Sequence, residues 1–301
     1  MDPKQKQKSR LANFACLAVA GIWGSGFIAS EYALEAQASP ALIMALRFSV
    51  AAALLALLAG RRIKQMPRHR VKQSIAAGLL LFAAFYLQIL GQRHTTVSNS
   101  AFLTATNVVM VPFLVWGATG KRPNAKTFML TGAALAGTGL LTISPGNAAF
   151  NIGDGMVLLC ALFFALHICC LGQIRQGGDP LCVTAVQLLT AAAASLLVLA
   201  LFDRGALCAV QPARALVPVL YLGVMSTGLC YLLQTWAQKY TSPAKAGIIL
   251  SAEGLFGSLF SVALRMEAFT PRLAAGGMMI LTVVILMELP PRKKGREGDA
   301  A

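Results

Sequence analysis

Long apolar stretches, broken by short polar segments, recur along almost the whole chain. Each approaches the roughly 20 residues that an α-helix needs to cross the hydrocarbon of a bilayer. The stretches lack the polar and apolar alternation that is typical of a membrane strand. The pattern predicts ten transmembrane helices, over residues 11–30, 41–60, 73–91, 100–118, 128–143, 155–174, 181–202, 216–236, 246–264 and 273–287. We therefore expect an all-α integral membrane protein without a substantial soluble domain.

The composition agrees with a membrane protein. Of the 301 residues, 57% are hydrophobic and 12% are charged, whereas an ordinary soluble domain has roughly 25% charged residues. One soluble core of this size could not bury so much apolar surface, but a bilayer accepts it. The first stretch follows a basic segment, as the core of a signal peptide does. It is longer than a typical signal core, and we interpret it as a retained helix.

The basic residues predict an orientation. The formal net charge is +15. If the N-terminus is cytoplasmic and the chain crosses ten times, the cytoplasmic segments hold 20 of the 26 Lys and Arg residues and the outer segments hold five. This distribution follows the positive-inside rule and places both termini in the cytoplasm, at a plasma (bacterial inner) membrane. Because the charge is dispersed over short loops, we expect no nucleic-acid partner.

The reactive residues give no sign of a cofactor or a metal. The seven cysteines form no CxxC pair and no secreted disulfide framework, and six of them lie within predicted spans, where they act as small packing residues. The chain has no P-loop and no H-E-x-x-H motif. We expect neither a metal nor a cofactor, and ATP-driven pumping by this chain alone is excluded.

The two halves of the chain resemble each other. A shift of 140 residues superposes Pro40 on Pro180 and Arg47 on Gln187. A shift of 146 residues superposes three further polar pairs, Gln88 on Gln234, Gln92 on Gln238 and Asn107 on Glu253. We divide the chain into repeats 1–147 and 148–301, each with five spans. Because five is odd, the second repeat enters the membrane inverted, which is a recurrent transporter architecture with the substrate near the midplane.

Several motifs, taken in order, resemble those of one family. They are Trp23-Gly-Ser-Gly-Phe27, Leu46-Arg47-Phe48 and the run from Tyr231 to Glu253. With the two halves of five spans, they make the chain similar to an EamA-type member of the drug/metabolite transporter superfamily over nearly its whole length. The resemblance implies ten helices, cytoplasmic termini and movement of small metabolites such as amino acids, often outward. Family members usually carry proline after the glutamate of the ninth span, whereas Gly254 follows Glu253 here, so we expect a softer kink.

Polar residues within spans are costly and are candidates for function. Glu253 and Asn107 lie near the middle of corresponding spans, where both can present acceptors to a substrate amine. Glu253 is also a candidate proton carrier, and the alternative for both residues is a packing hydrogen bond between helices. Gln88 and Gln234 form a second symmetric pair that needs polar partners.

Other candidates carry a charge or an aromatic ring. Arg47 can bind a substrate carboxylate, but we favour a structural ion pair with Glu31 or Glu35. His167 is either a cavity residue that binds or shuttles protons or a hydrogen-bonded packing residue. The rings of Trp23, Tyr86 and Tyr231 either line the route or pack between helices. Pro112 interrupts the fourth span and is a candidate hinge.

Two other functional classes remain open. Ser25 in Trp23-Gly-Ser-Gly26, with His167 as a distant base, approaches an intramembrane serine protease, and Asp154 approaches a G-x-G-D motif. Both motifs are incomplete, so we do not expect an enzyme. A passive channel is harder to dismiss. Its flux would be neither coupled to a proton gradient nor saturable at low substrate concentration. We favour a secondary transporter of small organic solutes, with export preferred and proton coupling left open, acting in the lipid bilayer as a monomer or homodimer.

Overall fold

The computed structural model describes residues 3–95, 97–142, 151–174, 178–265 and 268–288. These residues form helices joined by short connections, and no strand occurs among them. The first half contains α1 (Pro3–Glu35), α2 (Pro40–Ala59), the 3₁₀-helix η1 (Gly60–Gln65), α3 (Arg68–Gln92), α4 (Val97–Ala105), α5 (Asn107–Thr119) and α6 (Ala125–Thr142). The second half contains α7 (Ile152–Ile174), α8 (Pro180–Phe202), α9 (Ala206–Ala209), α10 (Pro212–Tyr221), the π-helix η2 (Leu222–Leu229), α11 (Cys230–Ala237), α12 (Pro243–Leu250), α13 (Glu253–Ala263) and α14 (Pro271–Glu288).

Several helices begin with the same local signature. Ser39, Asp179 and Ser242 each precede a proline at the first helical position, and each side chain accepts a hydrogen bond from a backbone N–H of the first turn. A polar N-cap satisfies an N–H group that has no intrahelical partner, and proline loses nothing at this position. These caps place the starts of α2, α8 and α12 at defined residues of the sequence.

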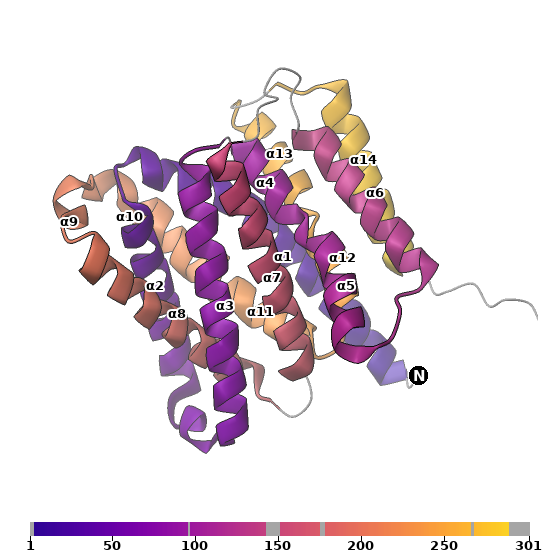
Figure 1. Cartoon of the computed structure of the whole chain (residues 1–301), viewed down its shortest axis with the longest axis horizontal. Helices are drawn as coiled ribbons and strands as arrows, with labels where there is room; N and C mark the ends of the chain where they lie inside the picture. Colours follow the sequence, from indigo (N-terminus) through magenta and orange to yellow (C-terminus); the bar gives the residue numbers. More distant parts are fainter. Residues whose placement is uncertain (1–2, 96, 143–150, 175–177, 266–267, 289–301) are drawn as a thin grey trace, which may run out of the picture.

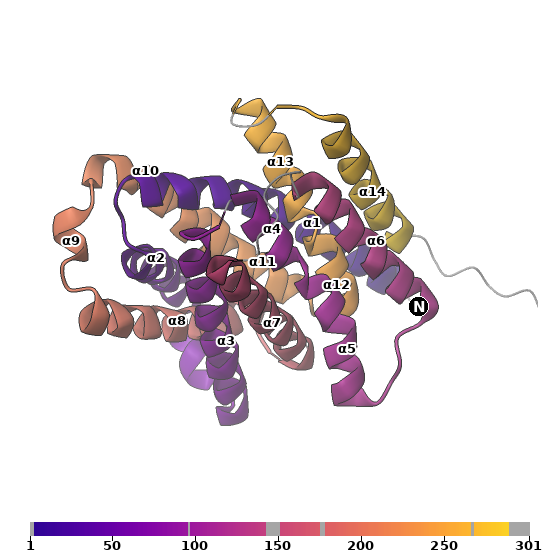
Figure 2. The same ribbon diagram turned by 45° about the horizontal axis from the view of Figure 1, so that its top comes forward.

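Eight helical segments among the described residues are long and apolar enough to cross a membrane. They correspond to eight of the ten predicted spans. The predicted spans 128–143 and 273–287 fall on α6 and α14, which have 18 residues each, and residue 143 lies outside the described ranges. These two helices pack side by side at one edge of the bundle (Figures 1 and 2). The all-helical membrane architecture is confirmed.

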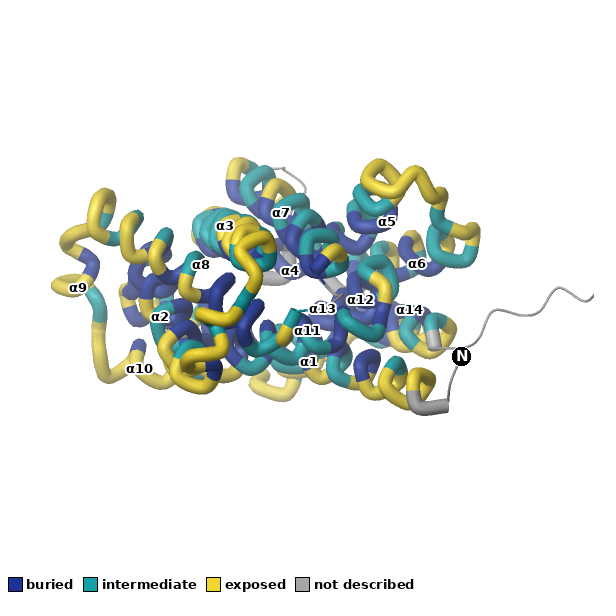
Figure 3. The backbone as a smooth tube through the Cα atoms, turned by 90° about the horizontal axis from the view of Figure 1, so that it is seen from below, coloured by how far each residue is buried: buried dark blue, intermediate teal, exposed yellow. Residues whose placement is uncertain are grey.

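Buried residues lie inside the bundle, and exposed residues lie on its outer surfaces and loops (Figure 3). The largest apolar cluster joins α2, α3 and α8 and includes Phe48, Leu81 and Leu188. Many large apolar side chains face outward instead, among them Leu57 and Met129. A soluble monomer rarely exposes so much contiguous apolar surface, so this outer surface is suited to contact with lipid.

Two corresponding spans are interrupted near their middle. The turn at Thr106 separates α4 from α5, and the turn at Ser251 and Ala252 separates α12 from α13. Pro112 lies within α5, beyond the first interruption. The second span has Gly254 where the family usually has proline, and it is interrupted nonetheless. Asn107 and Glu253 are therefore each the first residue of a half-helix.

Glycines allow close helix contacts at several positions. A Cβ at Gly78 of α3 would lie 2.4 Å from the Gln187 carbonyl oxygen of α8, and a Cβ at Gly24 of α1 would lie 2.5 Å from the backbone nitrogen of Gly257. At Gly132 of α6, by contrast, a built Cβ meets no atom of another helix within 4 Å. Gly132 and Ala136 face outward in this chain.

We expect Gly78→Ala to destabilise the protein. The added methyl group meets backbone, which cannot move aside as a flexible side chain can, and overpacking of this kind costs about 1–3 kcal/mol. Thermal unfolding in detergent, followed by intrinsic fluorescence, measures the effect. Gly132→Ala is the matched control, since its methyl group enters open space and alanine favours helix by up to about 1 kcal/mol. Equal melting temperatures for the two variants would contradict the close contact.

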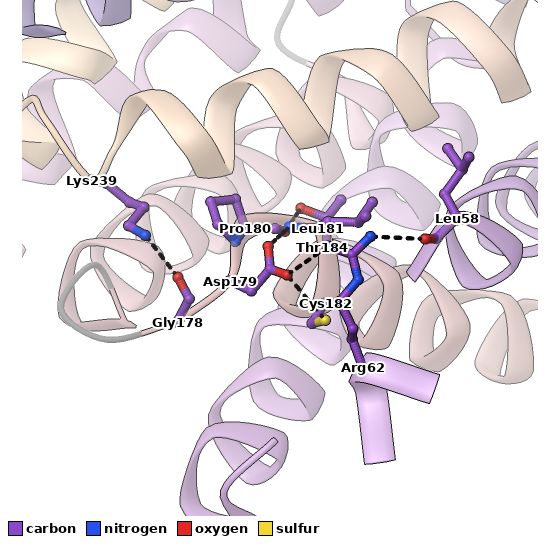
Figure 4. A network of polar contacts seen from close by, with 9 residues as sticks. All are labelled: Leu58, Arg62, Gly178, Asp179, Pro180, Leu181, Cys182, Thr184 and Lys239. Carbon is purple, nitrogen blue, oxygen red and sulfur yellow. Dashed lines mark hydrogen bonds and ion pairs between the residues drawn. The ribbon is translucent and has the colours of Figure 1, made fainter. Parts of the chain in front are cut away.

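Polar contacts tie several connections between helices together (Figure 4). Arg62 of η1 forms an ion pair with Asp179 at 3.5 Å, and Asp179 also accepts a hydrogen bond from the Leu181 N–H. Lys239 Nζ, beyond α11, donates to the Gly178 carbonyl at 2.9 Å. Because the ion pair is largely exposed, it adds little stability. Together the contacts join η1, the start of α8 and the end of α11.

Candidate functional site

A cavity lies in the middle of the bundle, between the two halves of the chain. Its walls come from α1, α2, α3, α4, α5, α7, η2, α11, α12 and α13. The cavity holds about 560 Å³ of space between atoms, counting the crevices between side chains and its open end. Seven of the nine candidate residues from the sequence line it: Trp23, Arg47, Gln88, Asn107, Tyr231, Gln234 and Glu253.

Glu253 and Asn107 reach the cavity from the two interrupted spans. Their residues are 6% and 9% exposed, respectively. Among the described residues, neither side chain has a hydrogen-bond or ion-pair partner. Each is the first residue of a half-helix, so its side chain extends from a point where the regular helix is interrupted. The packing hydrogen bond that the sequence left open for both residues is therefore absent within the described ranges, and their polar atoms are available to a solute.

Arg47 supplies the positive charge of the cavity wall. The residue is 3% exposed. Its Nε donates to Thr227 Oγ1 at 3.0 Å, and its Nη2 donates to Ser226 Oγ at 3.3 Å. Its guanidinium also lies over the ring of Phe85, 4.2 Å from the centroid, a cation–π arrangement.

The predicted ion pair of Arg47 with Glu31 or Glu35 is wrong. Within the described ranges, no carboxylate oxygen lies within 4.0 Å of the Arg47 guanidinium. Glu31 instead accepts a hydrogen bond from Gln92 Nε2 at 2.9 Å. The hydroxyls of Ser226 and Thr227 replace the expected carboxylate, because the π-helix η2 brings them against α2.

Aromatic rings form the apolar part of the wall. The rings of Trp23 and Tyr231 lie 5.3 Å apart, and Phe85 meets Tyr231 edge-on at 5.9 Å. Trp23 Nε1 donates to the Ser226 carbonyl at 2.9 Å, which fixes the indole. The Tyr231 hydroxyl is buried and has no hydrogen-bond partner among the described residues.

The two glutamines differ in their surroundings. Gln88 Nε2 donates to Thr104 Oγ1 at 3.1 Å. Gln234 is 1% exposed, and its Oε1 has no hydrogen-bond partner among the described residues. Buried polar atoms are normally satisfied. The unpartnered oxygens of Tyr231 and Gln234 in one wall therefore indicate a place that accepts donors from a bound molecule or from water.

Two candidate residues lie outside the cavity wall. Tyr86 stacks on Phe82 with 5.6 Å between the ring centroids. His167 lies behind Tyr231: its ring meets the Tyr231 ring edge-on, and its Nε2 pairs with Gln187 Oε1 at 2.9 Å. Gln187 Nε2 then donates to Thr235 Oγ1 at 3.2 Å. His167 thus has the contacts of a hydrogen-bonded packing histidine.

The residues of the enzyme alternatives are engaged elsewhere. Ser25 Oγ shares a hydrogen bond with the Tyr221 hydroxyl and donates to the Ile22 carbonyl, while His167 pairs with Gln187. Asp154 accepts from Thr95 Oγ1 at 2.6 Å and exchanges two hydrogen bonds with Asn151. This exchange is a capping box at the start of α7. Within the described ranges, no three His, Cys, Asp or Glu residues gather as metal ligands.

We expect Asp154→Ala to lower stability and to leave solute binding unchanged. The variant loses the reciprocal cap of α7, and loss of a cap costs about 1 kcal/mol. The melting temperature and the affinity for a solute, measured on one preparation, check both parts. A variant that keeps its melting temperature but loses binding would assign Asp154 to the site instead.

Other lining residues carried no signal in the sequence. Phe27, Phe85, Phe164, Ile168 and Leu250 are ordinary apolar residues of spans. Ser30, Thr104 and Ser226 are small polar residues of a kind that usually bonds to its own helix. Gly26 belongs to the motif Trp23-Gly-Ser-Gly26, in which the sequence pointed to Trp23 and Ser25. These residues are recognised as part of the cavity wall only because the fold brings together helices that are distant in sequence.

Comparisons with known proteins agree with this structure. The pattern of the EamA-like transporter family matches residues 10–143 and again residues 151–289. An uncharacterized transporter of Archaeoglobus fulgidus is 30% identical over 293 residues, which cover 94% of this chain and 87% of that protein. A protein of known crystal structure has the same fold, with a TM-score of 0.75 at 18% identity over 93% of this chain and 96% of the other. The chain is a multi-pass membrane protein that belongs to the EamA-like transporter family.

Proposed function

We propose that this protein is a secondary transporter that moves small zwitterionic solutes, such as amino acids, out across the plasma membrane. The observation that carries the proposal is a pair of opposite charges in one cavity. Arg47 comes from α2 in the first half of the chain, and Glu253 comes from α13 in the second half. A solute held by both residues would couple the two halves.

The chemistry of the wall suits an amino acid. The guanidinium of Arg47 is a donor for a carboxylate, and the side-chain oxygens of Glu253 and Asn107 are acceptors for an ammonium group. The rings of Trp23 and Phe85 offer an apolar surface to a side chain.

The packing of the helices supports ten spans in two inverted repeats, 1–147 and 148–301. Corresponding helices pack on each other, α2 on α8 and α6 on α14. In the two repeats, α1 corresponds to α7, α2 to α8, and α3 to the span of α10, η2 and α11. The contact of α3 with α7 has its counterpart in the contact of α11 with α1, and the contact of α3 with α8 has its counterpart in the contact of η2 with α2. An exchange of conformations between such halves would open the cavity to alternate sides.

The orientation and the coupling follow from the charges. The basic connections support cytoplasmic termini by the positive-inside rule. Glu253 is the single acid among the described residues that line the cavity, which makes it the proton carrier in this proposal.

Uptake into proteoliposomes tests the proposal. The labelled probe is a pool of the standard amino acids, offered with and without an imposed pH gradient. We expect saturable accumulation that follows the gradient. A passive channel is the competing function, and it would give flux that neither saturates nor accumulates. No movement of the pool by verified folded protein would overturn the proposed substrate class.

A further inference from the structure

The span formed by α10, η2 and α11 is widened at its centre. Over the eight residues Leu222–Leu229 the chain forms a π-helix. The corresponding span of the first half, α3, is a continuous α-helix of 25 residues. π-Helical turns are rare and occur frequently at functional sites. The first half has no π-helix at the corresponding place, so contacts made by η2 itself must explain it.

The π-helix faces the charged wall of the cavity. Two consecutive residues of η2, Ser226 and Thr227, both bond to the guanidinium of Arg47. A π-helix turns less per residue than an α-helix, so adjacent side chains can face the same partner. The Ser226 carbonyl accepts from Trp23 Nε1 as well. One turn of η2 thus contacts both Arg47 and Trp23.

Two glycines let the neighbouring helices approach η2. A Cβ at Gly223 would lie 2.9 Å from Val50 Cβ and 3.3 Å from the Arg47 carbonyl oxygen, so α2 lies directly against η2. A Cβ at Gly26 of α1 would lie 2.9 Å from Ser226 Oγ. The Ser226 hydroxyl therefore lies between α1 and Arg47, in space that a side chain at position 26 would fill.

The hydrogen bonds select one edge of the guanidinium. Nε and Nη2 share the edge that the two hydroxyls occupy. A guanidinium has five N–H donors in a fixed fork, and the three that remain, on Nη1 and Nη2, have no hydrogen-bond partner among the described residues. This second edge has the bidentate geometry that a carboxylate accepts. A buried charge without a counter-ion is costly, and a solute carboxylate would supply that counter-ion.

We propose that Ser226 and Thr227 are positioning residues that set the preference of the cavity for carboxylated solutes, by holding the Arg47 guanidinium with its second edge toward the cavity. The inference rests on the proposed function. The residues need not touch the solute. They act through Arg47, so their removal should affect carboxylated solutes and spare otherwise identical solutes that lack the carboxylate.

Competition in proteoliposomes tests this inference. Uptake of the labelled amino-acid pool is competed by the unlabelled pool and, separately, by a pool of the corresponding amino-acid amides, which keep the ammonium group and the side chains. For the wild type we expect the acids to compete at much lower concentration. For Thr227→Val, whose hydroxyl lies outside the cavity wall, loss of a hydrogen bond to a charged group should weaken competition by the acids about tenfold and leave competition by the amides unchanged. Ser226 lines the cavity, and Ser226→Ala should weaken competition by the acids more than competition by the amides.

Matched variants separate positioning from general damage. Thr227→Ser keeps the hydroxyl and should restore the preference for acids. Thr190→Val and Ser195→Ala remove hydroxyls that bond within α8, to Val186 O and Ala191 O, and should leave the preference at the wild-type value. If Thr227→Val does not fold, Ser226→Ala carries the test.

Two results would overturn the inference alone. One is an unchanged preference in folded Thr227→Val and Ser226→Ala. The other is an equal loss for acids and amides, which indicates a merely structural role. Failure of the wild type to move any of the pool overturns the proposed function itself, and with it this inference.

Discussion

Replacing Glu253 by glutamine abolishes gradient-driven accumulation in this account. Glutamine keeps the size of the side chain and an acceptor oxygen, but it cannot release and take up a proton. A pH gradient of one unit supplies about 1.4 kcal/mol per proton, which is a factor of about ten in accumulation. With one proton per solute, we expect roughly tenfold accumulation by the wild type and none by Glu253→Gln, measured in proteoliposomes with a labelled amino-acid pool.

The control for this prediction makes the same chemical change elsewhere. Asp154→Asn also turns a buried acid into an amide, but Asp154 lies in the cap of α7 and outside the cavity. It should retain gradient-driven accumulation. If Glu253→Gln accumulates solute as the wild type does, Glu253 is not the proton carrier, and the coupling group lies elsewhere.

Arg47→Gln is expected to give the second large effect, a loss of affinity for amino acids. Truncating one partner of a buried, hydrogen-bonded charge pair costs about 2–5 kcal/mol. Two kcal/mol corresponds to roughly a 30-fold rise in the half-saturating concentration of an amino acid. The variant should still fold, because replacing a buried charge by a neutral group is often tolerated. Concentration-dependent uptake and a melting curve measure the two quantities.

Lysine at the same position provides the comparison. Arg47→Lys keeps the positive charge but replaces the planar fork by a point charge. If the fork itself is needed, Arg47→Lys binds amino acids more weakly than the wild type, although it carries the same charge. An unchanged half-saturating concentration in Arg47→Gln would show that Arg47 does not contact the solute.

The sequence indicated the polar centre of the cavity because polar and charged side chains in a span are costly. Glu253, Asn107 and Arg47 stood out for this reason, and the shift of 146 residues paired the first two before any contact was known. Their shared position at the start of a half-helix follows from a local interruption. The sequence suggested it through Pro112, which lies beyond the interruption in its own span, and through the softer kink expected at Gly254.

The partners of Arg47 were beyond the reach of sequence reasoning. Glu31 and Glu35 were natural partners by charge and by proximity along the chain. The actual partners lie about 180 residues away, on a π-helix that no pattern in the sequence announced. Likewise, the sequence left open whether His167 lines the cavity or packs between helices, and its contacts with Tyr231 and Gln187 are those of a packing residue. Packing between helices distant in sequence determines the partners of Arg47 and His167, and hydrophobic periodicity along the chain does not predict that packing.

The account depends on a carrier that exposes one central site to alternate sides of the membrane. Counterflow tests this most directly. Proteoliposomes are loaded with an unlabelled pool of the standard amino acids and diluted into a trace of the labelled pool, without a pH gradient. The account predicts a transient accumulation of label above its equilibrium level. Unlabelled solute carried outward returns the site to the outside, where it binds labelled solute, and the excess of unlabelled solute inside keeps the label from leaving. A monotonic approach to equilibrium would contradict alternating access and favour a channel.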